Sequence, residues 1–320
     1  MLCLSESDII KAVTLTELVD AIESAFIIYE KGDFFMPPRM HIDYKKNTLL
    51  LMPCFTEDKF ATKLVSLFPD NPAINKPVLY GSVLLNDGET GEPLAIINGA
   101  KLTAMRTGAV GGVAVRWLSD NNSETLGIIG AGVQGFHQAL FCLNERNIKT
   151  LNVFDKNEKV IQGFINKIPE YKKNIKICRC KSSEEVLDNS EIIIMATTST
   201  KPVLTEKSEK LKDKTYVAIG SYKPEMKEFP AALFHLADQY FIDTEHAMEE
   251  SGDLIDPLNN NWFNKEKIYT AGKLLSGEIK LSENKTRIFK SVGMALFDLV
   301  VADLIYKKAI EKGIGTSVEI

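Results

Sequence analysis

"LGIIGAGVQGFHQAL", Leu126 to Leu140, is the stretch that decides the fold of this chain. Its three glycines, Gly130, Gly132 and Gly135, match the spacing G-x-G-x-x-G. The run before them, "TLGII" at 125–129, is apolar in the way that a buried parallel strand is apolar. The glycines alone would equally suit a tight strand-to-helix turn that needs glycine only for packing.

The residues that follow the glycines decide between these interpretations. Apolar side chains from Phe136 to Leu143 recur with the i, i+3, i+4, i+7 spacing of a helix with one buried face. A second apolar run, 150–154, ends at Asp155, 20 residues beyond Gly135. Strand, glycine turn, helix, strand and acid together form the dinucleotide-binding fingerprint. An acid at this position favours NAD over NADP, and Lys156 beside it leaves NADP as the alternative.

Each glycine has a physical task in this motif. Gly130 permits the tight turn, Gly132 lets the backbone approach a pyrophosphate, and Gly135 allows the helix to pack closely on the strand. The start of the helix then offers free N–H groups and a positive dipole end to the phosphates. Asp155 is expected to accept hydrogen bonds from the ribose hydroxyls.

Composition excludes several other classes of protein. The chain has 320 residues, enough for two domains, and its 45% hydrophobic and 25% charged content is ordinary for a globular protein. A net charge of −5 predicts neither a nucleic-acid partner nor an anionic membrane partner. Acids near the N-terminus, where a signal peptide has basic residues, predict a cytoplasmic protein. Five scattered cysteines and four histidines show no metal-ligand spacing, so no metal site is expected.

The rest of the chain divides into two patterns. A helix is predicted over 14–34, with Thr14 or Thr16 as its cap, and a second over 102–119. Four segments with strand character lie between these helices, at 48–53, 60–68, 80–87 and 93–99. Six strands alternate with helices farther on, at 125–129, 150–154, 175–178, 191–197, 215–220 and 240–244. A long final helix is predicted over 286–313.

This alternation predicts an α/β protein. Residues 116–294 are expected to form a Rossmann domain, which is a doubly wound parallel sheet that binds the dinucleotide. Residues 1–115 and 295–320 are expected to form a smaller mixed α+β domain for substrate binding and dimerisation. The final helix is expected to cross back onto that smaller domain.

At this point the sequence resembles the ornithine cyclodeaminase/mu-crystallin family over essentially its whole length. Nine segments carry the resemblance, in order: "MPPR" ending in Arg39, "LLLMP" to Pro53, "ATKLVS" with Lys63, "LTAMRTGA" with Arg106, "GIIGAGVQG", "ATTS" at 196–199, "GSYKPEMKE" at 220–228, "ESGDL" at 250–254 and "FKSVGMALFD" at 289–298. The resemblance implies a homodimer that uses NAD and acts on a small amino or imino acid.

The resemblance also implies which residues bind the substrate. Its carboxylate is expected to lie against Arg39, Lys63 and Arg106, since a carboxylate in a dry cleft needs fixed cations. For a lone arginine or lysine the alternative is a solvated surface cation. Strand alternation places Lys63 on one face with Ala61 and Val65, and burial there would require a partner anion.

Further positions are implied to contact NAD. Besides Gly130, Gly132, Gly135 and Asp155, they are Ser82, Arg106, Val133, Gln134, Thr197, Thr198 or its neighbour Ser199, and Ser291.

Two departures from the family pattern bear on the reaction. Ornithine cyclodeaminase has an aspartate where this chain has Tyr222, and a glutamate where it has Leu50. Orienting an ammonium group and moving protons during ammonia loss is work suited to carboxylates. A leucine cannot do it, and a phenol is a poor base at neutral pH. Ornithine cyclisation is therefore not the expected activity.

The leading hypothesis is an NAD(P)H-dependent reductase that converts a cyclic imino acid such as pyrroline-2-carboxylate, or a related ketimine, to the amino acid. Lys63 is the first candidate for the proton donor, with Tyr222 and bound water as the others. The alternatives are an ornithine cyclodeaminase, an opine-type synthase or amino-acid dehydrogenase, and a nucleotide-dependent small-ligand binding protein without catalysis.

Overall fold

A computed structural model describes residues 1–319 of the chain, which form two compact units. Unit 1 contains residues 1–106 and 294–320, and unit 2 contains Thr107–Gly293. The division falls after Arg106, inside helix α3 (Gly99–Leu118), whereas the sequence predicted a boundary after residue 115.

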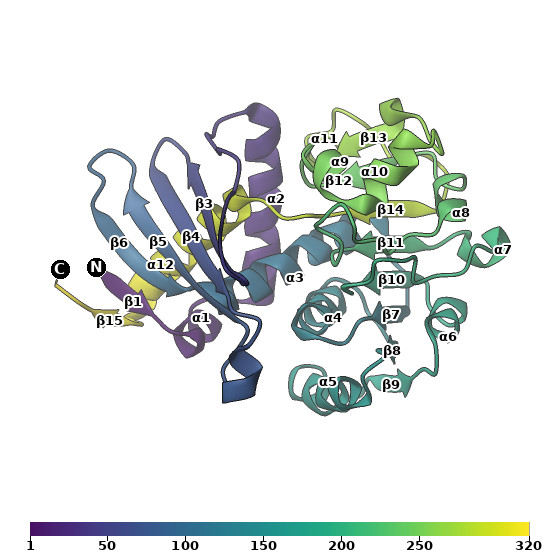
Figure 1. The fold of residues 1–320 in the computed structure, drawn as a ribbon, viewed down its shortest axis with the longest axis horizontal. Helices are drawn as coiled ribbons and strands as arrows, with labels where there is room; N and C mark the ends of the chain where they lie inside the picture. Colours follow the sequence, from purple (N-terminus) through teal and green to yellow (C-terminus); the bar gives the residue numbers. More distant parts are fainter. Residues whose placement is uncertain (320) are drawn as a thin grey trace. The chain divides into compact units, whose positions relative to one another are not determined.

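Unit 1 is built on a seven-stranded mixed sheet with the order β15-β1-β6-β5-β4-β3-β2 (Figure 1). Its strands are β1 (Leu2–Leu4), β2 (Met40–Tyr44), β3 (Asn47–Phe55), β4 (Lys59–Leu67), β5 (Leu79–Asp87), β6 (Pro93–Asn98) and β15 (Thr316–Ser317). Its helices are α1 (Glu6–Ala12), α2 (Leu15–Lys31), the 3-10 helix η1 (Asn71–Ile74) and α12 (Ala295–Lys312). Strands β3 to β6 confirm the four predicted strand segments, and β1, β2 and β15 were not predicted.

The long helices of unit 1 begin and end where local signals place them. Thr14 caps α2 by accepting a hydrogen bond from the Glu17 amide, and Gly32 ends the helix in the left-handed conformation, with φ 73°. Helix α12 packs on α2 and on β3 and β4, with Phe26 and Phe297 in edge-to-face contact at 5.0 Å. The predicted return of the final helix to the first domain is confirmed.

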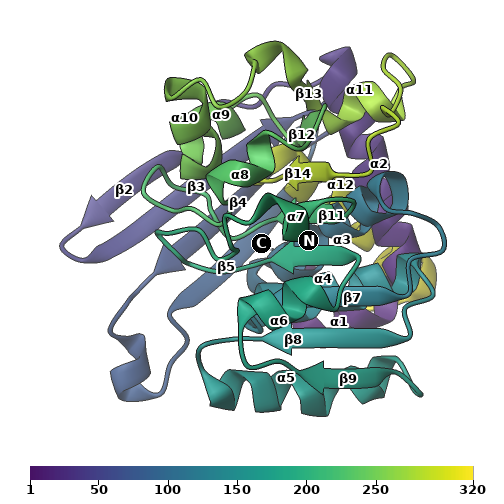
Figure 2. The ribbon, with the colours of Figure 1, turned by 90° about the vertical axis from the view of Figure 1, so that its right-hand side faces the viewer.

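Unit 2 is an eight-stranded parallel sheet with the order β13-β12-β14-β11-β10-β7-β8-β9 (Figure 2). Its strands are β7 (Thr125–Ile129), β8 (Thr150–Phe154), β9 (Lys176–Arg179), β10 (Ile192–Met195), β11 (Thr215–Ala218), β12 (Tyr240–Ile242), β13 (Ile268–Thr270) and β14 (Arg287–Lys290). Its helices are α4 (Val133–Glu145), α5 (Glu158–Tyr171), α6 (Ser183–Asp188), α7 (Ser208–Leu211), α8 (Ala231–Phe234), α9 (Ala247–Glu250), α10 (Gly252–Asn259), η2 (Lys265–Lys267) and α11 (Ala271–Leu275). Helices α4 and α5 cover one face of this sheet and α6 to α8 the other (Figure 1), so the predicted doubly wound α/β fold is confirmed.

The start of the final helix was predicted wrongly. Arg287–Lys290 form β14, which pairs with β11 and β12, and the helix begins only at Ala295. Gly293 has φ 77°, a left-handed conformation that stops a helix from extending backwards through it. An apolar run as short as "RIF" is compatible with a strand or a helix, and periodicity cannot distinguish the two.

Candidate functional site

The glycine turn of unit 2 has the geometry of an anion-binding helix start. Gly130 has φ 95°, and a Cβ on it would lie 2.5 Å from the Ala196 carbonyl oxygen. A Cβ on Gly135 would lie 1.8 Å from the Gly130 carbonyl oxygen, so only glycine lets α4 pack against β7 here. Helix α4 begins at Val133 without a side-chain cap, and a Cβ on Gly132 would meet no atom within 4 Å. The space beside Gly132 and the uncapped start of α4 fit the pyrophosphate of a dinucleotide.

Asp155 is fixed at this turn by two backbone hydrogen bonds. Its Oδ2 accepts from the Ala131 amide at 2.8 Å, and its Oδ1 accepts from the Asn157 amide at 2.8 Å. Nearby, the Val133 side chain is 67% exposed, and Gln134 has a buried Oε1 without a hydrogen-bond partner among the described residues. An exposed apolar side chain and an unpaired amide oxygen beside a helix start are features of a ligand site, so these residues suit a dinucleotide.

A buried glutamate ties together the loops that follow β10 and β11. Glu228 is fully buried, and its Oε1 accepts from the Thr197 amide at 2.7 Å and from the Thr197 hydroxyl at 2.9 Å. Its Oε2 accepts from the amides of Gly220 at 2.9 Å and Ser221 at 3.2 Å. Thr197 is one of the positions predicted to contact NAD, and its hydroxyl is committed to Glu228. The neighbouring Thr198 is exposed.

The backbone of Glu228 is held in turn by Asp253. Its backbone amide donates to Asp253 Oδ1 at 2.7 Å, and Asp253 Oδ2 lies 3.4 Å from the Lys290 ammonium. Burial raises the pKa of the Glu228 carboxyl, while Lys290 opposes that rise. Sequence reasoning gave Glu228 no role, although the segment "GSYKPEMKE" contains it.

A third buried carboxylate, that of Asp243, fixes the turn after β14. Asp243 Oδ2 accepts from the Ser291 hydroxyl at 2.6 Å and from the amides of Val292 at 3.0 Å and Gly293 at 2.6 Å. The Ser291 side chain, 2% exposed, is therefore engaged inside unit 2. Its predicted contact with NAD remains a prediction.

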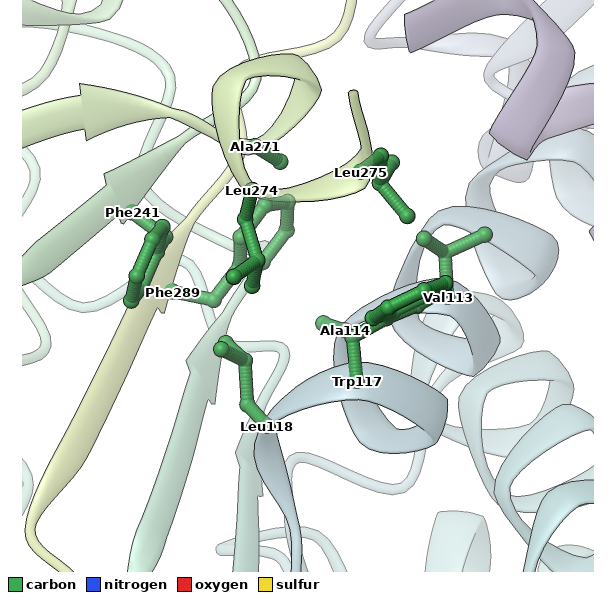
Figure 3. A pocket seen from close by; sticks show the side chains of 9 residues that line it. All are labelled: Val113, Ala114, Trp117, Leu118, Phe241, Ala271, Leu274, Leu275 and Phe289. Carbon is green, nitrogen blue, oxygen red and sulfur yellow. The ribbon is translucent and has the colours of Figure 1, made fainter. Parts of the chain in front are cut away.

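Unit 2 also carries a small apolar crevice, lined by side chains that include Trp117, Phe241 and Phe289 (Figure 3). Its lining residues contain no charged side chain and no residue that the sequence singled out. We assign it no part in the candidate site.

In unit 1, two of the three predicted substrate cations meet at one carboxylate. Lys63 on β4 is 3% exposed, and its Nζ lies 2.7 Å from Asp298 Oδ2. Arg106 on α3 is 6% exposed, and its Nε lies 3.0 Å from Asp298 Oδ1. Ala61 and Val65 are buried on the same face as Lys63, which confirms the predicted alternation. The anion that a buried Lys63 requires is Asp298, a residue that sequence reasoning had not singled out.

Burial and the neighbouring charges together set the pKa of Lys63. Burial lowers the pKa of the Lys63 ammonium to about 8, with Asp298 opposing that fall and with Arg106 and Arg39 adding to it. Arg39, the third predicted cation, is half-buried and lies within electrostatic range of Lys63. A lysine with this pKa is mostly charged at neutral pH and can still release its proton, as a general acid must.

Strand register places three more predicted positions. Leu50 pairs with Val65, so it shares the inner face of the sheet with Lys63. Ser82 pairs with Leu64 and therefore lies on the outer face, opposite to Lys63. Tyr222, in unit 2, is 45% exposed in the loop after β11.

A dinucleotide-binding unit together with a unit holding a buried pair of cations defines an oxidoreductase that acts on a small anionic substrate. The chain belongs to the ornithine cyclodeaminase/mu-crystallin family, whose model matches residues 1–313. The resemblance predicted from the sequence is confirmed.

Similar proteins agree with this assignment. The chain is 33% identical over 330 aligned residues to a Delta(1)-pyrroline-2-carboxylate reductase of Bacillus cereus, covering 100% of both. The Thermococcus litoralis Delta(1)-pyrroline-2-carboxylate reductase, solved with NADH and L-proline, has a TM-score of 0.91 and 34% identity, over 99% of this chain and 100% of that one. An archaeal alanine dehydrogenase dimer with bound NAD has a TM-score of 0.90 and 26% identity, over 100% of this chain and 99% of that one.

Proposed function

We propose that this protein is an NAD(P)H-dependent imine reductase that converts a cyclic imino acid, with Δ1-pyrroline-2-carboxylate as the first candidate, to the corresponding amino acid. The observation that carries the proposal is the buried cluster of Lys63, Arg106 and Asp298. It occurs in a chain that matches a Delta(1)-pyrroline-2-carboxylate reductase from end to end.

The charge of this cluster selects an anion. Two cations share one carboxylate, so the cluster carries one uncompensated positive charge inside unit 1. A buried charge is costly unless it is paired, and a substrate carboxylate supplies the missing partner. Arginine suits this role because its planar guanidinium can bind a carboxylate through two parallel hydrogen bonds.

Lys63 is the first candidate to protonate the imine nitrogen. Reduction adds a hydride to the C=N carbon and a proton to the nitrogen. With a pKa of about 8, Lys63 holds a proton at neutral pH and can transfer it in the transition state. Tyr222 remains the second candidate for this step.

The glycine turn, Asp155 and the loops after β10 and β11 would hold the cofactor, and the uncapped start of α4 would bind its phosphates. When bound, NADH supplies the hydride. The carboxylate of Asp155 favours NADH, because it would repel a 2′-phosphate.

Leu50 argues against ornithine as the substrate. It lies on the same sheet face as Lys63, at the position where the sequence pattern of ornithine cyclodeaminase has a glutamate. An aliphatic side chain there cannot orient an ammonium group, but it is compatible with a preformed ring.

We further propose that the protein is a homodimer that buries the outer face of the unit 1 sheet. This face presents Leu64, 43% exposed, with Leu84 at 37% and its cross-strand partner Ile96 at 36%. Met40 is 49% exposed, and register places it in one row with Leu51 and Leu64. Thr62 and Ser82 lie between these apolar side chains on the same face. Exposed apolar side chains gathered on one sheet face are typical of a protein contact. A second copy is the occupant that the dimeric alanine dehydrogenase suggests.

Within residues 1–319, no helix is long and apolar enough to cross a membrane. The expectations of a cytoplasmic location, of no nucleic-acid partner and of no bound metal stay predictions.

The test is NADH consumption with Δ1-pyrroline-2-carboxylate, followed by identification of proline as the product. Arg106→Ala should remain folded and lose nearly all activity, since removing one partner of a buried charge pair costs about 2–5 kcal/mol in binding. The matched control is Arg116→Ala on the same helix, where the arginine pairs with Glu145. Cofactor binding without turnover of any imino acid would instead support a carrier and refute the proposal.

A further inference from the structure

Asp298 lies in the first turn of α12, among the buried apolar residues Leu296, Phe297 and Leu299. It is 1% exposed. An acid near a helix start often interacts with the helix dipole and its free N–H groups. Asp298 is instead paired with two side chains from other elements, Lys63 on β4 and Arg106 on α3. An acid placed only to favour the helix would not require these partners.

We propose that Asp298 is a positioning residue, which holds the Lys63 ammonium and the Arg106 guanidinium side by side as one preorganised site for the substrate carboxylate. This inference rests on the proposed function and deepens it, because it explains how the two positive charges of Lys63 and Arg106 can be buried side by side.

The geometry assigns one cation to each oxygen of the Asp298 carboxylate. Lys63 Nζ lies 2.7 Å from Oδ2, and Arg106 Nε lies 3.0 Å from Oδ1. Without the carboxylate, the two cations would repel each other in a medium of low dielectric constant. Asp298 offsets that repulsion and sets the spacing of the pair.

The way in which Arg106 is held leaves its binding end available. Asp298 engages Nε, on the side of the guanidinium. Among residues 1–319, the two terminal nitrogens of Arg106 make no hydrogen bond. Within the same residues, Nε and both Asp298 oxygens make no hydrogen bond, so Arg106 is held through the ion pair at Nε. A guanidinium whose terminal nitrogens donate no hydrogen bond is suited to a ligand carboxylate.

The titratable groups around Asp298 give the inference a pH signature. They are Lys63 on β4, Cys54 on β3, Arg106 on α3 and, through Lys63, Arg39. Burial raises the pKa of the Cys54 thiol to about 12, so this group is neutral in the working range. Asp298 raises the pKa of Lys63 against the effect of burial. Removing the negative charge should therefore make Lys63 lose its proton at a lower pH.

The experiment is Asp298→Asn, with Asp303→Asn as the matched control on the same helix, where Asp303 pairs with Lys307. The KM for Δ1-pyrroline-2-carboxylate should rise about tenfold or more. The alkaline limb of the pH profile of kcat/KM should move to lower pH. The control should change neither. A residue with only a structural role would lower the melting temperature and scale the activity equally at every pH, and that result would overturn the proposal.

A measurement without turnover separates this inference from the proposed function. In protein labelled with ¹³C at lysine Cε, the Lys63 signal is the one missing from Lys63→Arg. It should titrate near pH 8 in the unmodified protein and at lower pH in Asp298→Asn. An unchanged titration overturns the inference even if the protein reduces imines. A shifted titration supports it even if the substrate proves to be different.

If Asp298→Asn alone does not fold, the double variant Lys63→Met with Asp298→Asn decides the matter. It removes one charge of each sign and should fold, because the defect of the single variant is an uncompensated cation. Failure of the double variant to fold as well would show that Asp298 is needed for the structure itself, and would overturn the proposal.

Discussion

Replacing Glu228 by glutamine changes a single atom of the buried carboxylate that joins two loops of unit 2. In the native protein its oxygens accept four hydrogen bonds, from the amide and hydroxyl of Thr197 and from the amides of Gly220 and Ser221. A glutamine has one acceptor oxygen, so its NH2 group must face donors on one side. In the better orientation, the glutamine oxygen still accepts hydrogen bonds from the Gly220 and Ser221 amides. The glutamine NH2 group then donates to the Thr197 hydroxyl, which rotates to accept. The Thr197 amide then remains buried without a partner.

An unsatisfied buried N–H costs about 1–3 kcal/mol. For a unit of the size of Thr107–Gly293, each kcal/mol lowers the melting temperature by about 2–4 °C. The expected loss is therefore about 2–12 °C. If NADH binding must reorder the loosened loops, the same free energy raises the Kd for NADH by about 5–150-fold.

Thermal unfolding and NADH titration measure the two effects. Glu225→Gln is the matched control, because Glu225 is an exposed glutamate in the same loop. It should change neither quantity. Unchanged stability of Glu228→Gln would refute the reasoning, since it would mean that the four donors do not need the charged carboxylate. A loss of stability with an unchanged Kd would show that the loops do not contribute to cofactor binding.

Three further outcomes are expected. The pKa of Lys63 is lowered on folding, so the unfolded chain binds more protons between about pH 8 and the ordinary lysine value. This group should therefore raise the free energy of unfolding by about 3 kcal/mol as pH rises through that window. Denaturant titrations at several pH values give the free energy of unfolding of the unmodified protein and of Lys63→Met, and the difference between them measures this contribution. If the two free energies change with pH in parallel, the expectation is wrong. Asp155→Ser should raise the affinity for NADPH relative to NADH, and an unmodified protein that already prefers NADPH would show that this role of the acid is wrong. With Leu50 and Tyr222 in place of two carboxylates, each worth about 10²–10⁴-fold in rate, ornithine should yield no measurable ammonia or proline, and robust formation of both would contradict the imine-reductase proposal.

Local patterns in the sequence were enough to predict the glycine turn of the dinucleotide-binding unit. Gly130 must adopt positive φ and Gly135 must touch the preceding turn, so these requirements can be read from residue type and spacing alone. The cap of α2 at Thr14 is equally local. Such features depend on neighbours within a few residues, and for that reason a single sequence contains them.

The partners of the site residues could not be predicted in the same way. Asp298 is 235 positions from Lys63 in the chain, and it resembles any acid in the first turn of a helix. Burial of Lys63 predicted that an anion must exist, but not which of the 43 acidic residues it is. The prediction missed strand β14 for a related reason, because its four residues become a strand only through pairing with β11 and β12.

The buried charge clusters around Lys290 in unit 2 and around Lys63 in unit 1 differ in how far the protein itself pairs their charges. In unit 2, the buried carboxyls of Glu228, Asp253 and Asp243 interact with Lys290, so acids outnumber cations there. The Glu228 carboxyl is already met inside the fold, since it accepts from three amides and a hydroxyl. In the part of the chain that the structure describes, Asp253 Oδ2 and Lys290 Nζ make no hydrogen bond and have each other as ion-pair partners. In unit 1 the excess charge is positive, and no backbone carbonyl among the described residues accepts a hydrogen bond from the terminal nitrogens of Arg106. A buried cation that is not fully paired inside the protein is costly, and an anion from outside can supply the missing partner. We therefore expect a ligand to complete the cluster of Lys63, Arg106 and Asp298, and the sign of its excess charge predicts that this ligand is an anion.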